Sequence, residues 1–326
     1  MSKINFTHDY NYIISLENLL GAWREFLRGK RSRKDVQSFS LRLIENIYDL
    51  HSDLLNNQYY HGRYEAFRIN DPKPRNIHKS QVRDRLLHHA VYRQLYPFFD
   101  RIFITDSFSC RINKATYKAI KKFRKFYLKE SLNDTRTCWV LKCDIRKFFE
   151  NINHQVILDI LGQYIFDQRV INLLKNIIYS FSSAPGRGLP LGNLTSQLLV
   201  NIYMNEFDQY VKHKLKAKYY IRYADDFVVL SHDKSLLEEL LPKIGDYLKE
   251  ELKLDLHPDK ISIKTIFSGV DFLGWVHFPD HRILRSATKN RMIRNLEVNK
   301  SRETKASYLG LLKHGNTYNI KKKLSL

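Results

Sequence analysis

The chain has 326 residues, 43% of them hydrophobic and 13% aromatic, so it can bury a sizeable core and is not a disordered nucleic-acid-binding tail. Its 55 Lys and Arg residues exceed its 34 Asp and Glu residues, for a formal net charge of +21. Such an excess indicates a polyanionic partner, either nucleic acid or an anionic membrane surface. The membrane alternative is disfavoured because no apolar run approaches twenty residues and no signal or lipidation pattern occurs.

The N-terminal third combines helices with one hairpin. Hydrophobic residues at helical spacing predict helices across 10–60, interrupted by a basic loop at 28–34. Two short strands are expected at 64–69 and 75–78, because the residues between them, 70–74, are rich in turn formers.

Two further helices are predicted at 82–99 and 115–129. The second is amphipathic, with an apolar face and a cationic face that carries Lys118, Lys121, Lys122, Lys125 and Lys129. This cationic face suits contact with nucleic-acid phosphates, although it could equally be a solvated helix face.

The middle of the chain alternates strands and helices. A strand is expected at 137–145 and a helix after it; a Gly/Pro/Ser-rich stretch at 182–193 then leads into a helix that ends near 210. Residues 219–231 are expected to form a β-hairpin whose turn contains Ala224-Asp225-Asp226.

The C-terminal part begins with a charged helix expected at 234–252, followed by strands at 261–266 and 272–278. From Arg285 onward the chain carries 11 basic side chains and 2 acidic ones. So one-sided a charge favours contact with phosphates, with a solvated face as the alternative. The three cysteines, Cys110, Cys138 and Cys143, form no CxxC pair, which is typical of reduced thiols in a cytoplasmic protein.

Two acidic elements stand out in this basic chain: Asp144 at the end of an apolar strand, and the adjacent Asp225 and Asp226 between two apolar strands. Carboxylates beside hydrophobic surface are costly unless a cation compensates them, and Mg²⁺ prefers oxygen ligands. Two such ions, about 3.5–4 Å apart, are the usual device for phosphoryl displacement at nucleic-acid ends. The alternatives are ordinary turn chemistry for the Asp pair and a helix N-cap for Asp144.

Several blocks in order resemble the reverse transcriptase family across residues 60 to 280. Tyr223-Ala-Asp-Asp226 resembles its catalytic box, Asp144-Ile-Arg-Lys-Phe-Phe-Glu-Asn-Ile152 its first-aspartate motif, and Leu189-Pro-Leu-Gly-Asn-Leu-Thr-Ser-Gln197 the motif between them. Further blocks resemble the fingers motifs and the lysine and thumb-entry motifs; they are Pro74-Arg-Asn-Ile-His78, Val82-Arg-Asp-Arg-Leu-Leu-His-His-Ala90, Leu256-His-Pro-Asp-Lys-Ile261 and Phe272-Leu-Gly-Trp275.

The resemblance implies an α+β right-hand polymerase fold with an RNA-directed DNA polymerase activity. Its parts would be an N-terminal helical extension at 1–60, fingers at 61–136, a palm with a small antiparallel ferredoxin-like sheet at 137–280, and a short helical thumb at 281–326. Within the palm, the region 155–190 would belong partly to the fingers.

The resemblance also assigns roles in the reaction. Asp144, Asp225 and Asp226 would be catalytic and would hold two Mg²⁺ ions, for which Mn²⁺ could substitute, with Ile145 lending only its backbone carbonyl. The nucleotide would be bound by Arg68, Arg75, Phe149, Leu191, Gln197 and Lys260, with Lys73 as a weaker candidate. The nucleic acid would be bound by Tyr223, Lys121, Lys122, Lys125, Arg285, Arg291 and Arg294.

Phe149 matches the position where an aromatic ring excludes a 2′-hydroxyl, which would select deoxynucleotides; a core aromatic is the alternative. Lys73 could instead be a solvated surface side chain. Lys260 could touch the nucleotide's phosphate, anchor the palm, or be a surface lysine.

The central motif departs from the usual family pattern. The family carries Gln before the Gly and ends in Ser-Pro, whereas this chain has Leu191-Gly192 and Ser196-Gln197. That pattern resembles the reverse transcriptases of diversity-generating retroelements, bacterial and phage enzymes that copy a template RNA with errors at adenines. The resemblance implies as partners the template RNA, the primer or cDNA duplex, deoxynucleoside triphosphates and a pentameric basic accessory protein, in the cytoplasm and with no membrane.

Leu191 cannot hydrogen-bond the incoming nucleotide as Gln can, so it is expected to loosen base selection, alone or with Gln197. The alternative is that Leu191 only packs. Other enzyme types left open are retron, abortive-infection and group II intron-like reverse transcriptases, and outside the enzymes a catalytically idle nucleic-acid-binding protein.

Overall fold

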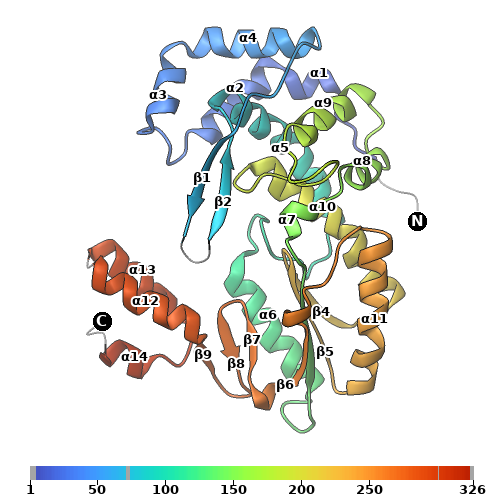
Figure 1. Ribbon diagram of the computed structural model, residues 1–326, viewed down its shortest axis with the longest axis vertical. Helices are drawn as coiled ribbons and strands as arrows, with labels where there is room; N and C mark the ends of the chain where they lie inside the picture. Colours follow the sequence, from blue (N-terminus) through green and yellow to red (C-terminus); the bar gives the residue numbers. More distant parts are fainter. Residues whose placement is uncertain (1–4, 71–73, 300, 324–326) are drawn as a thin grey trace.

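The computed structural model describes residues 5–70, 74–299 and 301–323. In the upper part of Figure 1 the predicted N-terminal helices appear as four separate helices, α1 (Tyr10–Ile14), α2 (Leu16–Phe26), α3 (Lys34–Leu41) and α4 (Leu43–Leu55). The chain breaks between α1 and α2 because the Ser15 hydroxyl accepts a hydrogen bond from the Asn18 backbone and caps the second helix.

The predicted hairpin is confirmed as β1 (Glu65–Ile69) and β2 (Arg75–Lys79), paired antiparallel with Phe67 opposite Ile77. It projects downward in Figure 1 from the helical part of the molecule. The next helix, α5 (Val82–Ile102), packs against α2 and α10 (Leu194–Gln209).

A four-stranded antiparallel sheet forms the centre of the lower part. Its strands stand in the order β4 (Tyr219–Tyr223), β5 (Asp226–Ser231), β3 (Trp139–Asp144) and β6 (Ser262–Thr265). Successive side chains alternate between its faces. Val140 and Val228 pack on one side with α6 (Ala115–Glu130), while Leu141 and Phe227 pack on the other with α10 and α11 (Lys234–Glu250).

The remaining elements connect this framework. The segment between β3 and β4 holds α7 (Phe148–Asn151), α8 (His154–Gly162), α9 (Gln168–Tyr179) and, after α10, the π-helix η1 (Tyr210–Lys214). Two short 3₁₀ turns, η2 (Pro258–Lys260) and η3 (Ile266–Ser268), flank β6. These features confirm an α+β fold with antiparallel sheets.

The prediction of one strand at 272–278 is wrong. The chain forms β7 (Val270–Phe272) and β8 (Trp275–His277), which pair with β9 (Arg282–Leu284) in a separate three-stranded sheet. Leu273 and Gly274 both have positive φ, 53° and 84°, and two such residues make a tight hairpin turn. Of the expected palm strands after residue 260, β6 alone therefore joins the central sheet.

The basic C-terminal segment is helical as expected, with α12 (Ser286–Val298), α13 (Arg302–Leu312) and α14 (Tyr318–Lys323). Together with the three-stranded sheet it forms a small hydrophobic core, in which Met292 and Leu296 pack with Trp275 and Leu284. Across the described residues, none of the helices has the length and apolar character that crossing a membrane requires.

Candidate active site

Strand register brings the distant acidic residues together. Asp144 on β3 lies directly opposite Asp226 on β5, and Asp225 stands in the two-residue turn between β4 and β5. The Ile145 backbone N–H donates to the Asp225 carbonyl oxygen at 3.1 Å, which ties the turn to the end of β3. Asp144 is not a helix N-cap, because Lys147 occupies that position of α7.

The catalytic-box turn is strained. Ala224 has a φ of +56°, and a left-handed conformation costs a non-glycine residue about 1–2 kcal/mol. Such strain persists only where surrounding contacts hold it. Here the Arg222 guanidinium donates to the Ala224 carbonyl oxygen at 3.1 Å.

Two lysines approach the carboxylates. Lys260 Nζ donates to Asp144 Oδ1 at 2.6 Å, and Lys142 Nζ lies 3.8 Å from Asp226 Oδ2. Asp226 Oδ1 is buried and has no hydrogen-bond partner in the described structure. This end of the sheet therefore has a carboxylate oxygen available to a further cation.

Burial raises the pKa of both turn carboxyls. The pKa of Asp226 rises to about 7, because burial and the neighbouring Asp144, Asp225 and Asp271 outweigh the opposing effect of Lys142. The pKa of Asp225 is also raised, by burial and by Asp144, against the opposing effects of Lys260 and Arg75. Crowded, desolvated carboxylates of this kind favour a bound proton or a bound metal ion.

Asp226→Asn is expected to stabilise the protein without bound metal at pH 8 by about 2 kcal/mol, because the ionised carboxylate is then buried at a cost. The raised native pKa means that the native state binds more protons than the unfolded state between pH 4 and pH 7. Stability from this group therefore falls as pH rises through that window, and the gain from Asn should vanish towards pH 4. Urea unfolding of both proteins with a chelator at pH 4.5 and 8 measures this; equal stability at pH 8 would contradict it.

The residues around the carboxylates fit a magnesium site in chemistry. Among the residues that the structure describes, no three His, Cys, Asp or Glu side chains are grouped closely enough to hold an ion unaided. Magnesium sites at phosphoryl-transfer centres usually take only one or two carboxylates and complete their shell with substrate phosphates and water. Asp144, Asp225, Asp226 and the Ile145 carbonyl supply oxygen donors alone, which is the set that Mg²⁺ prefers.

The carboxylates line a cavity of about 1050 Å³ that runs from β2 past the central sheet to β7 and the start of α12. Many of the predicted site residues meet there. Besides the three aspartates, the lining includes Arg75, Phe149, Leu191, Gln197, Tyr223, Lys260 and Arg285.

Other predicted residues lie elsewhere. Arg68 is exposed on β1 and is not among the described residues of this lining. On α6, Lys121 and Lys125 are exposed, while Lys122 pairs with Asp106 at 2.9 Å, so its charge is compensated locally. Arg291 and Arg294 belong to α12. Lys73 falls outside the described residues.

Three residues of the site were missed from the sequence. Lys142 precedes Asp144 by two positions, so strand alternation could have placed it on the same face. Asp271 lines the cavity from β7 and pairs with Arg285 at 2.9 Å, a contact that depends on the unexpected hairpin. Buried Asn193 accepts a hydrogen bond from the Ser80 hydroxyl and donates to the His78 carbonyl oxygen, which fixes the central motif to the base of β2.

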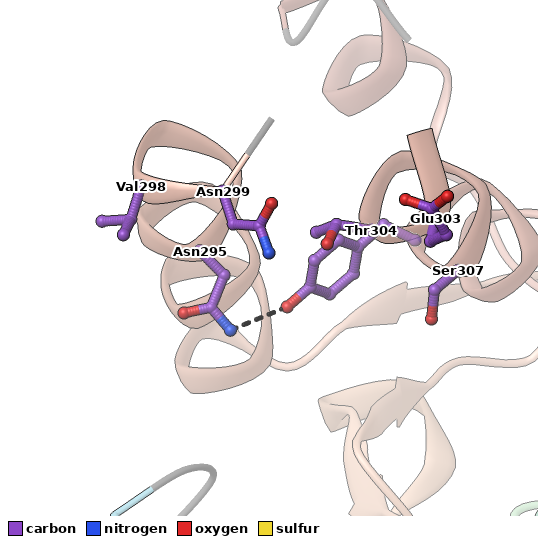
Figure 2. A pocket seen from close by; sticks show the side chains of 7 residues that line it. Asn295, Val298, Asn299, Glu303, Thr304 and Ser307 are labelled. Atoms are coloured by element: carbon purple, nitrogen blue, oxygen red, sulfur yellow. Dashed lines mark hydrogen bonds between the residues drawn. The ribbon is translucent and has the colours of Figure 1, made fainter. Parts of the chain in front are cut away.

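A second cavity, of about 470 Å³, lies between α12 and α13. In Figure 2 the side chains of Asn295 and Asn299 point toward residues of α13, whereas Val298 points away from them. The Asn295 amide donates to the Tyr308 hydroxyl at 2.9 Å. Glu303 is the one charged residue of its described lining, so this cavity lacks the several carboxylates that line the larger one.

The sequence matches a known protein family whose reaction fits the carboxylates of the larger cavity. Residues 70–311 match the family described as reverse transcriptase (RNA-dependent DNA polymerase). The matched span covers well over half of the chain and includes the central sheet, the catalytic box and the hairpin strand that carries Arg75. The chain belongs to the reverse transcriptase family and is an RNA-directed DNA polymerase.

Individual relatives are distant. Protein YkfC of Escherichia coli strain K12 is 27% identical over 83% of this chain and 80% of its own length. The group II intron-encoded protein LtrA of Lactococcus lactis subsp. cremoris is 23% identical over 88% of this chain, and the match spans 58% of LtrA. The retron Ec73 reverse transcriptase of Escherichia coli is 28% identical over 40% of this chain and 43% of its own length.

Proposed function

We propose that the chain copies a template RNA into cDNA by two-metal-ion nucleotidyl transfer and that it is the error-prone enzyme of a diversity-generating retroelement. The observation that carries the proposal is the position of Leu191 and Gln197, which line the same cavity as Asp144, Asp225 and Asp226. The residues that depart from the usual family pattern thus face the space where a new base pair would form.

The catalytic part of the proposal assigns metal binding to Asp144, Asp225 and Asp226, with the Ile145 carbonyl. Bound Mg²⁺ would supply neutralisation of the triphosphate charge and activation of the primer 3′-hydroxyl. The unpartnered Asp226 Oδ1 and the raised pKa values of the turn carboxyls support this assignment. Lys260 donates a hydrogen bond to Asp144 Oδ1 at 2.6 Å, and Arg75 offers a cation from β2 for the triphosphate.

The fidelity part of the proposal depends on the absence of a hydrogen-bonding group in the Leu191 side chain. Its side chain is half-buried at the cavity wall, and its carbonyl oxygen accepts a hydrogen bond from the His78 N–H of β2 at 3.2 Å. The backbone is therefore held in place, while the side chain offers no donor or acceptor to the incoming nucleotide. A pocket without that polar restraint discriminates base-pair geometry less well.

Sequencing the cDNA that the wild-type protein makes on an RNA template of balanced composition tests the proposal. Errors should concentrate opposite template adenines. An even spread of errors over the four template bases would indicate instead an enzyme of the retron or group II intron type, the classes to which two of the relatives belong. Absence of any extension product from a bound primer–template would favour the idle nucleic-acid-binding alternative.

Phe149→Val is expected to raise ribonucleotide incorporation relative to deoxynucleotide incorporation by roughly 100-fold, because the ring would no longer meet a 2′-hydroxyl. Phe149 is partly buried against the core and lines the cavity. The measurement is the ratio of kcat/KM for matched ribo- and deoxynucleotides. Phe166→Val, at an exposed phenylalanine away from the cavity, is the control. If the ratio is unchanged in Phe149→Val, Phe149 contributes only to packing.

The proposed parts keep the bounds expected from the sequence. The N-terminal extension would hold α1 to α4, the fingers the β1–β2 hairpin with α5 and α6, the palm the central sheet with α10 and α11, and the thumb α12 to α14. Exposed Lys121 and Lys125, together with Arg294, remain candidates for phosphate contact, and the pentameric accessory protein belongs to the same proposal.

A further inference from the structure

A fully buried arginine stands behind the catalytic turn. Arg222 on β4 and Asp208 on α10 are both 0% exposed. The guanidinium makes a two-pronged contact with the carboxylate, from Nε to Oδ1 and from Nη2 to Oδ2, each at 2.7 Å. The buried Tyr220 hydroxyl also donates to Asp208 Oδ1 at 2.7 Å, so the acid is held by two neighbouring side chains of the sheet.

The guanidinium also contacts three other residues. Nη1 donates to the Ala224 carbonyl oxygen at 3.1 Å and lies 3.4 Å from Asn201 Oδ1 on α10, while Nη2 donates to the Ser107 hydroxyl at 3.1 Å. The Arg222 backbone also bonds to both neighbours of Ser107, since its N–H donates to the Asp106 carbonyl oxygen and its own carbonyl oxygen accepts from the Phe108 N–H, each at 3.0 Å. One side chain therefore joins α10, the 106–108 segment and the turn.

The contact with Ala224 is the one that bears on chemistry. Ala224 is the residue with positive φ, and Asp225 follows it directly. The Asp225 carbonyl oxygen is fixed on its other side by the Ile145 N–H. Arg222 and Ile145 thus hold two consecutive peptide groups, and the orientation of the Asp225 side chain follows from them.

Stability alone accounts poorly for this arrangement. The desolvation free energy of two buried charges offsets much of the attraction between them. Well-packed apolar residues therefore commonly replace a buried ion pair without loss of folding stability. Lysine in place of arginine would keep the charge opposite Asp208, but it cannot make the forked contact and also reach the turn. The guanidinium geometry, rather than the charge, is what this site uses.

We propose that Arg222 is a positioning residue, which holds the Ala224 carbonyl and so sets Asp225 for metal binding, with Asp208 as its anchor. The proposal rests on the proposed function of Asp225.

The test uses two variants. One is the single substitution Arg222→Lys, and the other is the double substitution Arg222→Met and Asp208→Leu, which replaces the ion pair with two apolar side chains. Ser107→Ala is the matched control, since it removes one hydrogen bond from the same guanidinium without touching the turn. For each protein, the fraction able to bind primer–template is titrated first. The single-turnover incorporation rate per bound complex, the Mg²⁺ concentration for half-maximal rate and the affinity for primer–template are then measured.

Both Arg222 variants should lose about 100-fold in rate per bound complex, the effect expected of a misplaced catalytic group, and should need more Mg²⁺. Affinity for primer–template should stay as in the wild type, and Ser107→Ala should remain near wild type throughout. A loss confined to the folded or binding-competent fraction, with normal rate and Mg²⁺ requirement per complex, would overturn the proposal. Normal activity of Asp225→Asn would overturn the proposed function instead, so the two failures are distinguishable.

Discussion

Asp225→Asn is expected to lower Mg²⁺-dependent primer extension on an RNA template by at least about a thousandfold, because the neutral amide binds a metal ion poorly and leaves the developing charge uncompensated. Affinity for primer–template should change little, since the charged neighbours of Asp225 are Asp144, Lys260 and Arg75 rather than a row of exposed basic side chains. The measurement is the single-turnover rate with a matched deoxynucleotide.

Asp246→Asn is the control, because it makes the same chemical change at an exposed carboxylate of α11 in the lower part of the molecule. It should leave the rate unchanged. If Asp225→Asn keeps more than about a tenth of the wild-type rate, Asp225 is not a metal ligand in the reaction, since loss of a catalytic group lowers the rate much further.

Leu191→Gln is expected to reduce misinsertion opposite template adenine by about tenfold while leaving correct insertion near the wild-type rate. The amide adds a donor and an acceptor at the wall of the cavity, and the peptide that carries it is already tied to His78 of β2. Single-turnover rates for each of the four deoxynucleotides opposite each template base measure the effect.

Leu191→Met is the matched control, because it changes the shape of the side chain and adds no hydrogen-bonding group comparable to an amide. It should keep the wild-type error pattern. If Leu191→Gln misinserts opposite adenine as often as the wild type, Leu191 only packs, and any preference for errors at adenine must originate elsewhere.

Local pattern and motif order predicted much of the site. Asp144 ends one strand, and Asp225 and Asp226 lie where the turn of a hairpin meets its second strand. Their meeting required only that β3 and β5 pair, which they do with Asp144 opposite Asp226. The hairpin that presents Arg75 was likewise visible from its strand composition and its turn residues.

Long-range contacts were not visible in the sequence. Arg222 is one of 55 basic residues, and nothing in its neighbours along the chain indicates that Asp208, on a helix across the sheet, neutralises it. Asp271 escaped notice because it precedes the strand expected at 272–278, and because Leu273 adopts a positive φ that leucine rarely takes, so the hairpin there was not predicted. The tertiary environment overrides local preference at both places.

In the proposed mechanism Asp144 and the Asp225-Asp226 pair, which begins 81 positions further along the chain, serve one metal site. Iron-mediated cleavage tests it directly: Fe²⁺ replaces Mg²⁺ in the complex with primer–template and nucleotide, and the radicals formed at the ion cut the nearby backbone. The predicted result is cleavage next to residue 144 and within 223–226 of the same chain, suppressed by excess Mg²⁺ and lost in Asp225→Asn. Cleavage at only one of these segments, or cleavage that Mg²⁺ does not suppress, would contradict a metal site shared by the two segments.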